Sequence, residues 1–239
     1  MLKLRALKGI IIVLTTLVVF SNLPATAGAE PALTHKIYTD GETLLSSLLL
    51  PLSTDQKEAK CYASYFRPGV FRGGQQYVLV LAPAHCLGAA PNLNFYINIP
   101  GRGWKLMEPV AFLSRLGGSL PDLFIGQIRE ERPFPLYFKI ENCPSLSDKN
   151  GVFLTAATPA RLGKTPETQK LKFVGRTSDD FLEFRAEKSI ELGLSGAPVV
   201  TKDGCLAGMI VMHDPLVHQR AYAMPVDKIM EIYNLYIKY

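Results

Sequence analysis

The sequence contains few cysteines and histidines, the side chains that most often bind zinc. Its 239 residues include only four cysteines and four histidines. No two cysteines form a C-x-x-C pair, and no group of cysteines and histidines has the spacing of a zinc site. These absences exclude the common zinc-binding and dithiol redox motifs. We therefore expect the protein to need neither a metal nor a cofactor.

Strong charge of one sign, internal repeats and bilayer-length apolar runs are also missing. The formal net charge is +5, from 26 basic and 21 acidic residues. Three of the basic residues, Lys3, Arg5 and Lys8, lie in the first 29 positions, which hold no acidic residue. The remainder thus has 23 basic and 21 acidic residues, a net charge of +2. With no basic stripe, we expect no nucleic-acid partner.

The amino-terminal segment has the features of an export signal. The three basic residues precede an apolar run at Gly9–Phe20, and small residues follow at 25–29. This order predicts a cleaved signal peptide over residues 1–29, with cleavage after Ala27 or Ala29. A membrane anchor is the alternative, but the run is shorter than the roughly 20 residues that span a bilayer. We expect an exported protein, periplasmic or secreted, with no stable membrane anchor.

Export permits disulfide bonds, because thiols oxidise outside the cytoplasm. The four cysteines, Cys61, Cys86, Cys143 and Cys205, allow three different pairings. Residues 30–60 give a weak pattern. The apolar run Thr43–Leu52 predicts a short helix, and the whole segment is either part of the body or a pro-segment.

Short runs rich in Val, Ile, Phe and Tyr begin at Cys61 and alternate with clusters of Gly, Pro, Asn and Asp. Such runs predict β-strands separated by turns. The predicted strands are Cys61–Phe66, Tyr77–Ala82, Leu93–Ile99, Pro109–Leu113, Leu123–Ile128, Leu136–Ile140, Val152–Ala156, Lys170–Arg176, Phe181–Arg185, Ala197–Thr201, Leu206–Met212 and Arg220–Met224. About a dozen strands at this spacing indicate an all-β fold, a sandwich or a pair of barrels.

One helix is predicted, at the carboxyl terminus. Pro225 is placed at its first position, where proline is favoured. The apolar residues that follow recur at helical spacing and form one stripe: Val226, Ile229, Met230, Tyr233 and Ile237. We expect this stripe to pack on the β-body.

The stretch Glu191–Val200 (ELGLSGAPVV) places Ser195 between two glycines that are close enough to shape a tight turn. Such a turn can expose a serine hydroxyl and point backbone N–H groups at one position, which acyl transfer requires. Taken alone, the stretch fits equally well a glycine-rich turn with a solvated serine.

Two further residues complete a candidate catalytic set. His85 follows an apolar strand, and Asp122 precedes one. A serine needs a base to accept its proton, and a histidine base needs a carboxylate to fix its tautomer. Each residue alone is commonly structural, His85 as a core histidine and Asp122 as a turn residue.

Together, Ala84-His85-Cys86, Asp122-Leu123 and Gly193-Leu194-Ser195-Gly196-Ala197-Pro198 resemble the signatures of trypsin-like serine proteases. The resemblance covers residues 61–239 and is nearest to the bacterial HtrA-like and glutamyl-endopeptidase-like branch, without a PDZ domain. It implies two packed six-stranded antiparallel β-barrels with a carboxyl-terminal helix. It also implies disulfide bonds Cys61–Cys86 and Cys143–Cys205.

By this resemblance, Ser195 is the nucleophile, His85 the general base and Asp122 the residue that orients it. The N–H groups of Gly193 and Ser195 form the oxyanion hole. The substrate pocket is lined by Ser189, Ile190, Ile210, Met212 and Tyr222, and we interpret His213 as a loop residue outside it.

The function implied is that of a serine endopeptidase acting on protein or peptide substrates through an acyl-enzyme. The alternative is a non-catalytic binding or scaffold protein on the same fold, because the residues alone do not show their geometry. The oligomeric state is left open.

Overall fold

The computed structural model describes residues 45, 49–57, 60–72, 75–87, 94–99, 101–113, 122–130, 138, 140, 143, 151–161, 163–164, 166–214 and 216–237. The predicted signal peptide and most of the segment 30–60 lie outside these residues, so both stay predictions. In the part of the chain that is described, no helix combines the length and apolarity needed to cross a membrane.

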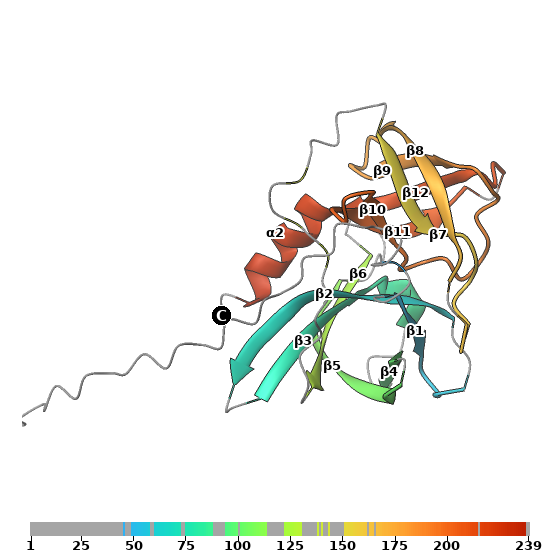
Figure 1. The fold of residues 1–239 in the computed structure, drawn as a ribbon. Helices are drawn as coiled ribbons and strands as arrows, with labels where there is room; N and C mark the ends of the chain where they lie inside the picture. The colour runs from blue at the N-terminus through green and yellow to red at the C-terminus, as the bar shows by residue number, and fades with distance from the viewer. Residues whose placement is uncertain are drawn as a thin grey trace, which may run out of the picture. The chain divides into compact units, whose positions relative to one another are not determined.

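Twelve antiparallel strands form two closed six-stranded barrels (Figure 1). The first has the strand order β1-β2-β3-β6-β5-β4 and the second β10-β11-β12-β9-β8-β7. The strands of the first are β1 (Leu49–Ser53), β2 (Cys61–Arg72), β3 (Gln75–Ala82), β4 (Phe95–Ile99), β5 (Gly103–Leu113) and β6 (Leu123–Glu130). Those of the second are β7 (Val152–Ala156), β8 (Thr168–Arg176), β9 (Leu182–Ala186), β10 (Pro198–Thr201), β11 (Leu206–His213) and β12 (Arg220–Pro225). The predicted all-β fold of two barrels is thus confirmed.

Alternation of side chains produces both barrel cores. Along β8, Leu171 and Phe173 are buried while Lys170 and Lys172 are exposed, as expected for a strand with one face inside. Aromatic rings fill the second barrel, where the ring centroids of Phe153 and Phe184 lie 5.3 Å apart. In the first barrel Phe95 and Phe124 meet edge to face at 5.5 Å. Edge-to-face packing is a favoured arrangement for buried rings.

The first barrel closes through a strand that the sequence did not predict. We expected a helix over Thr43–Leu52, but Leu49–Ser53 form β1, which pairs with both β2 and β4. Leu50 and Leu52 are buried, and Pro51 lies between them. A proline is poorly tolerated inside a helix, and β1 supplies the partner that β2 and β4 need. The helix prediction is therefore wrong for this half of the segment; of the other half, only Leu45 is described, as a helical residue.

A second correction concerns the predicted strand Leu136–Ile140. Phe138 and Ile140, its two described residues, belong to no strand. Phe138 is nonetheless buried. The apolar run indicated burial correctly, but burial does not require pairing in a sheet.

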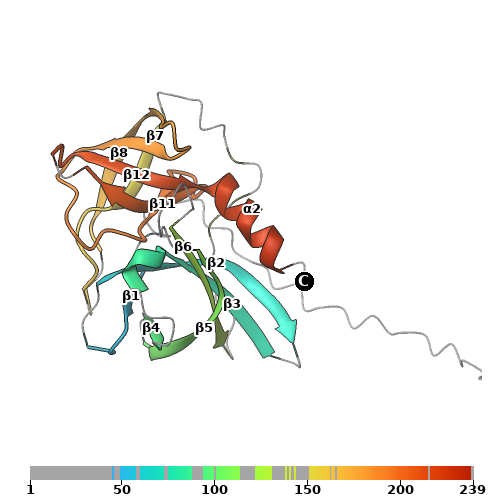
Figure 2. The same cartoon turned by 180° about the vertical axis from the view of Figure 1, so that it is seen from behind.

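Helix α2 (Val226–Ile237) packs against β11 and β12 (Figure 2). Ile229 is buried, and Val226, Met230 and Tyr233 pack partly buried against the core. The predicted stripe is confirmed for these residues. The boundary differs by one position, since Pro225 ends β12 and pairs with Gly208.

Candidate active site

His85 lies in a short turn that presents its side chain to solvent. After β3 ends at Ala82, residues Ala84–Leu87 form one turn of 3₁₀ helix, η1. Ala84, Cys86 and Leu87 are buried, whereas the His85 side chain is 46% exposed. The buried neighbours hold the backbone while the imidazole remains accessible to a ligand.

Asp122 immediately precedes β6 and is buried, and it contacts His85 twice. Its Oδ1 accepts a hydrogen bond from the His85 backbone N–H at 2.8 Å, and its Oδ2 is hydrogen-bonded to His85 Nδ1. The pairing of β3 with β6, in which Ala82 lies opposite Phe124, brings the two segments together. With Nδ1 as donor, Nε2 carries the free lone pair of the neutral imidazole, as a base requires.

The structure does not join Ser195 to this pair. Among the described residues, no hydrogen bond connects Ser195 Oγ with His85, and Nε2 instead lies 3.5 Å from Cys86 Sγ. The predicted meeting of His85 with Asp122 is observed, whereas the predicted contact between His85 and Ser195 stays a prediction.

The turn that carries Ser195 is held by backbone contacts from both barrels. The Ser195 carbonyl accepts a 2.8 Å hydrogen bond from Tyr62 N–H of β2. Gly196 N–H donates to the Ile210 carbonyl of β11, also at 2.8 Å. The Gly196 carbonyl accepts a 3.1 Å hydrogen bond from the buried Ser64 hydroxyl.

Both glycines around Ser195 are required by this geometry. Gly193 has φ +92° and Gly196 has φ +87°, a region that other residues rarely adopt. A Cβ on Gly196 would lie 1.9 Å from the Tyr62 carbonyl oxygen. The glycine therefore permits the approach of the two barrels as well as the turn.

The predicted pocket residues lie in two places. Met212 and Tyr222, both half-buried, oppose each other across β11 and β12, and Ile210 is next to the serine turn. Ile190 is buried and its N–H donates to the His218 carbonyl, while Ser189 is exposed.

His213, which we interpreted as a loop residue, is the last residue of β11 and pairs with Ala221. The prediction of a loop at this position is wrong, because the strand extends further than its apolar run; that His213 lies outside the substrate pocket stays a prediction.

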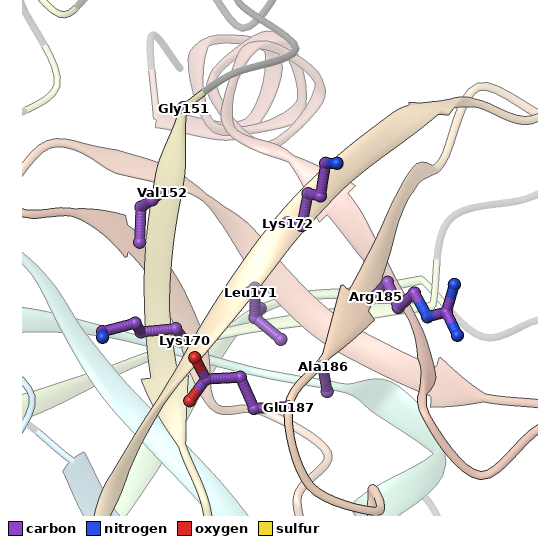
Figure 3. A pocket seen from close by; sticks show the side chains of 8 residues that line it. All are labelled: Gly151, Val152, Lys170, Leu171, Lys172, Arg185, Ala186 and Glu187. Atoms are coloured by element: carbon purple, nitrogen blue, oxygen red, sulfur yellow. The ribbon is translucent and has the colours of Figure 1, made fainter.

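A hollow of about 460 Å³ lies elsewhere, on β7, β8 and β9 of the second barrel (Figure 3). Its lining consists of Gly151, Val152, Lys170, Leu171, Lys172, Arg185, Ala186 and Glu187. None of the predicted site residues lines this hollow.

The two disulfide bonds are Cys61–Cys86 and Cys143–Cys205, the pairing that the resemblance implies. The sulfurs of Cys61 and Cys86 and a ring nitrogen of His85 lie within 4.8 Å of one another. Metal binding by cysteine needs a thiolate, and both sulfurs are bonded to each other. The donor set therefore does not fit a metal ion in the oxidised protein.

Two site residues were missed from the sequence, Tyr62 and Ser64 of β2. Both are buried and reach across to the serine turn. In the sequence they look like ordinary residues of an apolar strand, so no pattern singled them out.

No family model matches the chain, and no curated protein matches it. Solved structures are similar in fold. The serine endoprotease from Yersinia pestis superposes with a TM-score of 0.63 at 15% identity, over 83% of this chain and 65% of that one. The HtrA-type protease AlgW, with a decapeptide, gives 0.61 at 14% identity, over 84% and 68%.

A protein from M. tuberculosis, in the inactive form of a serine-to-alanine variant, gives a TM-score of 0.58 at 12% identity, over 81% and 88%. This chain thus spans just under two thirds of the Yersinia pestis protein. At these identities the likeness establishes the fold, and the chain has the two-barrel fold of the HtrA-type serine proteases.

Proposed function

We propose that the protein is an exported serine endopeptidase that hydrolyses peptide bonds through an acyl-enzyme on Ser195. The observation that carries the proposal is the start of β2. Cys61 is bonded to Cys86, the neighbour of His85, and the next residue, Tyr62, donates its N–H to the Ser195 carbonyl. Two consecutive residues of β2 therefore connect the turn that carries His85 with the turn that carries Ser195.

The proposed reaction uses only residues of this chain. Ser195 Oγ attacks the carbonyl carbon of the scissile bond while His85 Nε2 accepts its proton. Asp122 stabilises the imidazolium, which returns that proton to the leaving amine. A water molecule, deprotonated by His85, then hydrolyses the ester. These steps require the His85 ring to move so that Nε2 contacts Ser195 Oγ instead of Cys86 Sγ. Such a change on substrate binding is common, because catalytic hydrogen bonds often tighten only in the substrate complex.

The oxyanion donors are proposed to be the N–H groups of Gly193 and Ser195. Among the described residues, neither amide donates to another protein group, so both can serve a ligand. Loss of one such donor typically lowers kcat by about 10² to 10³.

The substrate is proposed to be a peptide with an apolar or small residue at the cleavage site. Ile210 and Met212, with Ile190, Ser189 and Tyr222, form the proposed pocket. Peptide as substrate also agrees with the fold likeness to a protease that was solved with a decapeptide. Export agrees with the two disulfide bonds and with the predicted signal peptide.

A second candidate function, that of a non-catalytic binding or scaffold protein, is favoured by one observation: Ser195 Oγ has no hydrogen bond to His85 among the described residues. A binding or scaffold protein on this fold would look the same. The two functions differ in the reactivity of the serine.

The test is labelling of the purified, disulfide-bonded protein with a fluorophosphonate probe, compared with Ser195→Ala and His85→Ala. Ser178→Ala, which changes an exposed serine in the β8–β9 turn, is the matched control. We expect wild type and the control to be labelled and the two site variants to stay unlabelled. Folded wild type that is not labelled would refute the endopeptidase and favour the binding protein.

A further inference from the structure

Tyr62 contacts the turn that carries Ser195 and also the segment after β7 that packs behind this turn. Its side chain is buried, with 2% exposure. Its backbone N–H donates to the Ser195 carbonyl at 2.8 Å. Its hydroxyl donates to the Thr158 carbonyl, also at 2.8 Å, in the segment that follows β7. One residue of the first barrel therefore reaches two segments of the second.

The segment that Tyr62 contacts lies against the other end of the turn. Pro159 follows Thr158, and a Cβ built on Gly193 would lie 3.1 Å from Pro159 Cβ. That distance is tighter than an ordinary carbon contact, so Pro159 lies close against the backbone of Gly193. Displacement of Thr158 would consequently shift the surface on which Gly193 rests.

We propose that Tyr62 is a positioning residue for the oxyanion donors, through Thr158 and Pro159 to Gly193 and directly to Ser195. The inference rests on the proposed function, since it concerns the two amides of that site. Preorganised donors must be placed within about 0.5 Å to stabilise a transition state. A buried hydroxyl that anchors the segment behind Gly193 supplies such a constraint.

The hydroxyl retains its role over the working pH range of a hydrolase. Burial raises the pKa of Tyr62 to about 12, so the proton that is donated to Thr158 is kept in neutral and mildly alkaline solution. Ser64, two residues along β2, adds a hydrogen bond from its hydroxyl to the Gly196 carbonyl at 3.1 Å. This second bond holds the Gly196 end of the turn, whereas the Tyr62 hydroxyl acts at the Gly193 end through Thr158 and Pro159.

The test removes only the hydroxyl. In Tyr62→Phe we expect the fluorophosphonate labelling rate, and kcat on a peptide substrate, to fall about tenfold with KM nearly unchanged, because a donor is misplaced rather than lost. The matched control is Tyr65→Phe, a second buried tyrosine of β2, for which we expect rates within about twofold of wild type. A Tyr62→Phe enzyme that is labelled at the wild-type rate would overturn the inference.

Hydrogen exchange provides a readout that does not depend on activity. In Tyr62→Phe, amides in the stretch 191–197 should exchange about fivefold faster than in wild type or Tyr65→Phe. If wild type is not labelled at all, the proposed function fails while this measurement still decides the role of Tyr62. Unchanged exchange would contradict that role. Should Tyr62→Phe fail to fold, Pro159→Gly removes the Cβ that packs on Gly193 and is expected to give the same two effects.

Discussion

The two halves of the candidate site are held in different ways. In the first barrel, Asp122 contacts His85 through a side-chain pair and a backbone hydrogen bond. In the second barrel, Ser195 is held by its backbone carbonyl, and its hydroxyl has no hydrogen bond to His85 among the described residues. The contact between His85 and Asp122 is thus formed, whereas the contacts of Ser195 described here are those of its backbone.

This difference follows from where the supporting contacts come from. The ends of the antiparallel pair β3 and β6 bring Asp122 to His85 within one barrel. The serine turn depends on residues far away in the chain, such as Ser64, which is 132 positions from Gly196. Changes between the barrels should therefore disturb the serine half much more than the histidine half.

The largest expected effect on activity comes from changing Asp122, which contacts His85 in the first barrel. Asp122→Asn keeps the size of the side chain but favours the wrong histidine tautomer, so kcat should fall about 10⁴-fold. The fall in kcat is measured by steady-state hydrolysis of an unstructured peptide. Asp179→Asn, at an exposed position, serves as the control. A loss of less than tenfold would show that Asp122 does not orient a catalytic base.

The next largest effect should come from separating the barrels at the serine turn. Gly196→Ala places a methyl group where the Tyr62 carbonyl lies, at a positive φ. We expect labelling to slow by about 10²-fold or more, because displacements near 1 Å cost this much. The melting temperature should fall as well.

Gly175→Ala is the matched control for this substitution, since a Cβ there meets nothing within 4 Å. We expect its labelling rate and melting temperature to stay close to those of wild type. Equal effects of the two substitutions would contradict the argument from close approach.

Removing the two disulfide bonds one at a time should have a smaller effect on labelling and should distinguish the bond beside His85 from the other. They close loops with sequence separations of 25 and 62 residues, for which the chain-entropy account gives stabilities of about 3 to 4 kcal/mol each. Double serine variants of each pair should lose similar stability in urea unfolding. Only Cys61→Ser with Cys86→Ser should also slow labelling, by about tenfold, because Cys86 adjoins His85 and Cys61 adjoins Tyr62.

Labelling is compared at a temperature where both double variants remain folded. If the double variant of Cys143 and Cys205 slows labelling by the same factor, the Cys61–Cys86 bond has no specific effect on the site, and the slowing reflects the lower stability that both variants share.

Much of the fold followed from local pattern. The strand Val152–Ala156 was predicted with its observed bounds, because a β-branched and apolar run between turn residues leaves little alternative. Leu49–Ser53 was missed because five residues with a proline show no clear period, and the need for a partner strand decided their structure. Leu136–Ile140 failed in the opposite direction, since Phe138 is buried without pairing.

The site divides along the same line. The local pattern, taken together with the resemblance to trypsin-like signatures, was enough to select His85, Asp122 and Ser195, although each of them alone also fits a structural role. It was also enough to place glycines on both sides of Ser195, where the backbone needs positive φ. The tertiary structure decided the contacts of Tyr62 and Ser64 and the closure of the first barrel by β1. These features depend on contacts between separate segments of the chain, 96 positions apart for Tyr62 and Thr158 and 132 for Ser64 and Gly196, which no local pattern encodes.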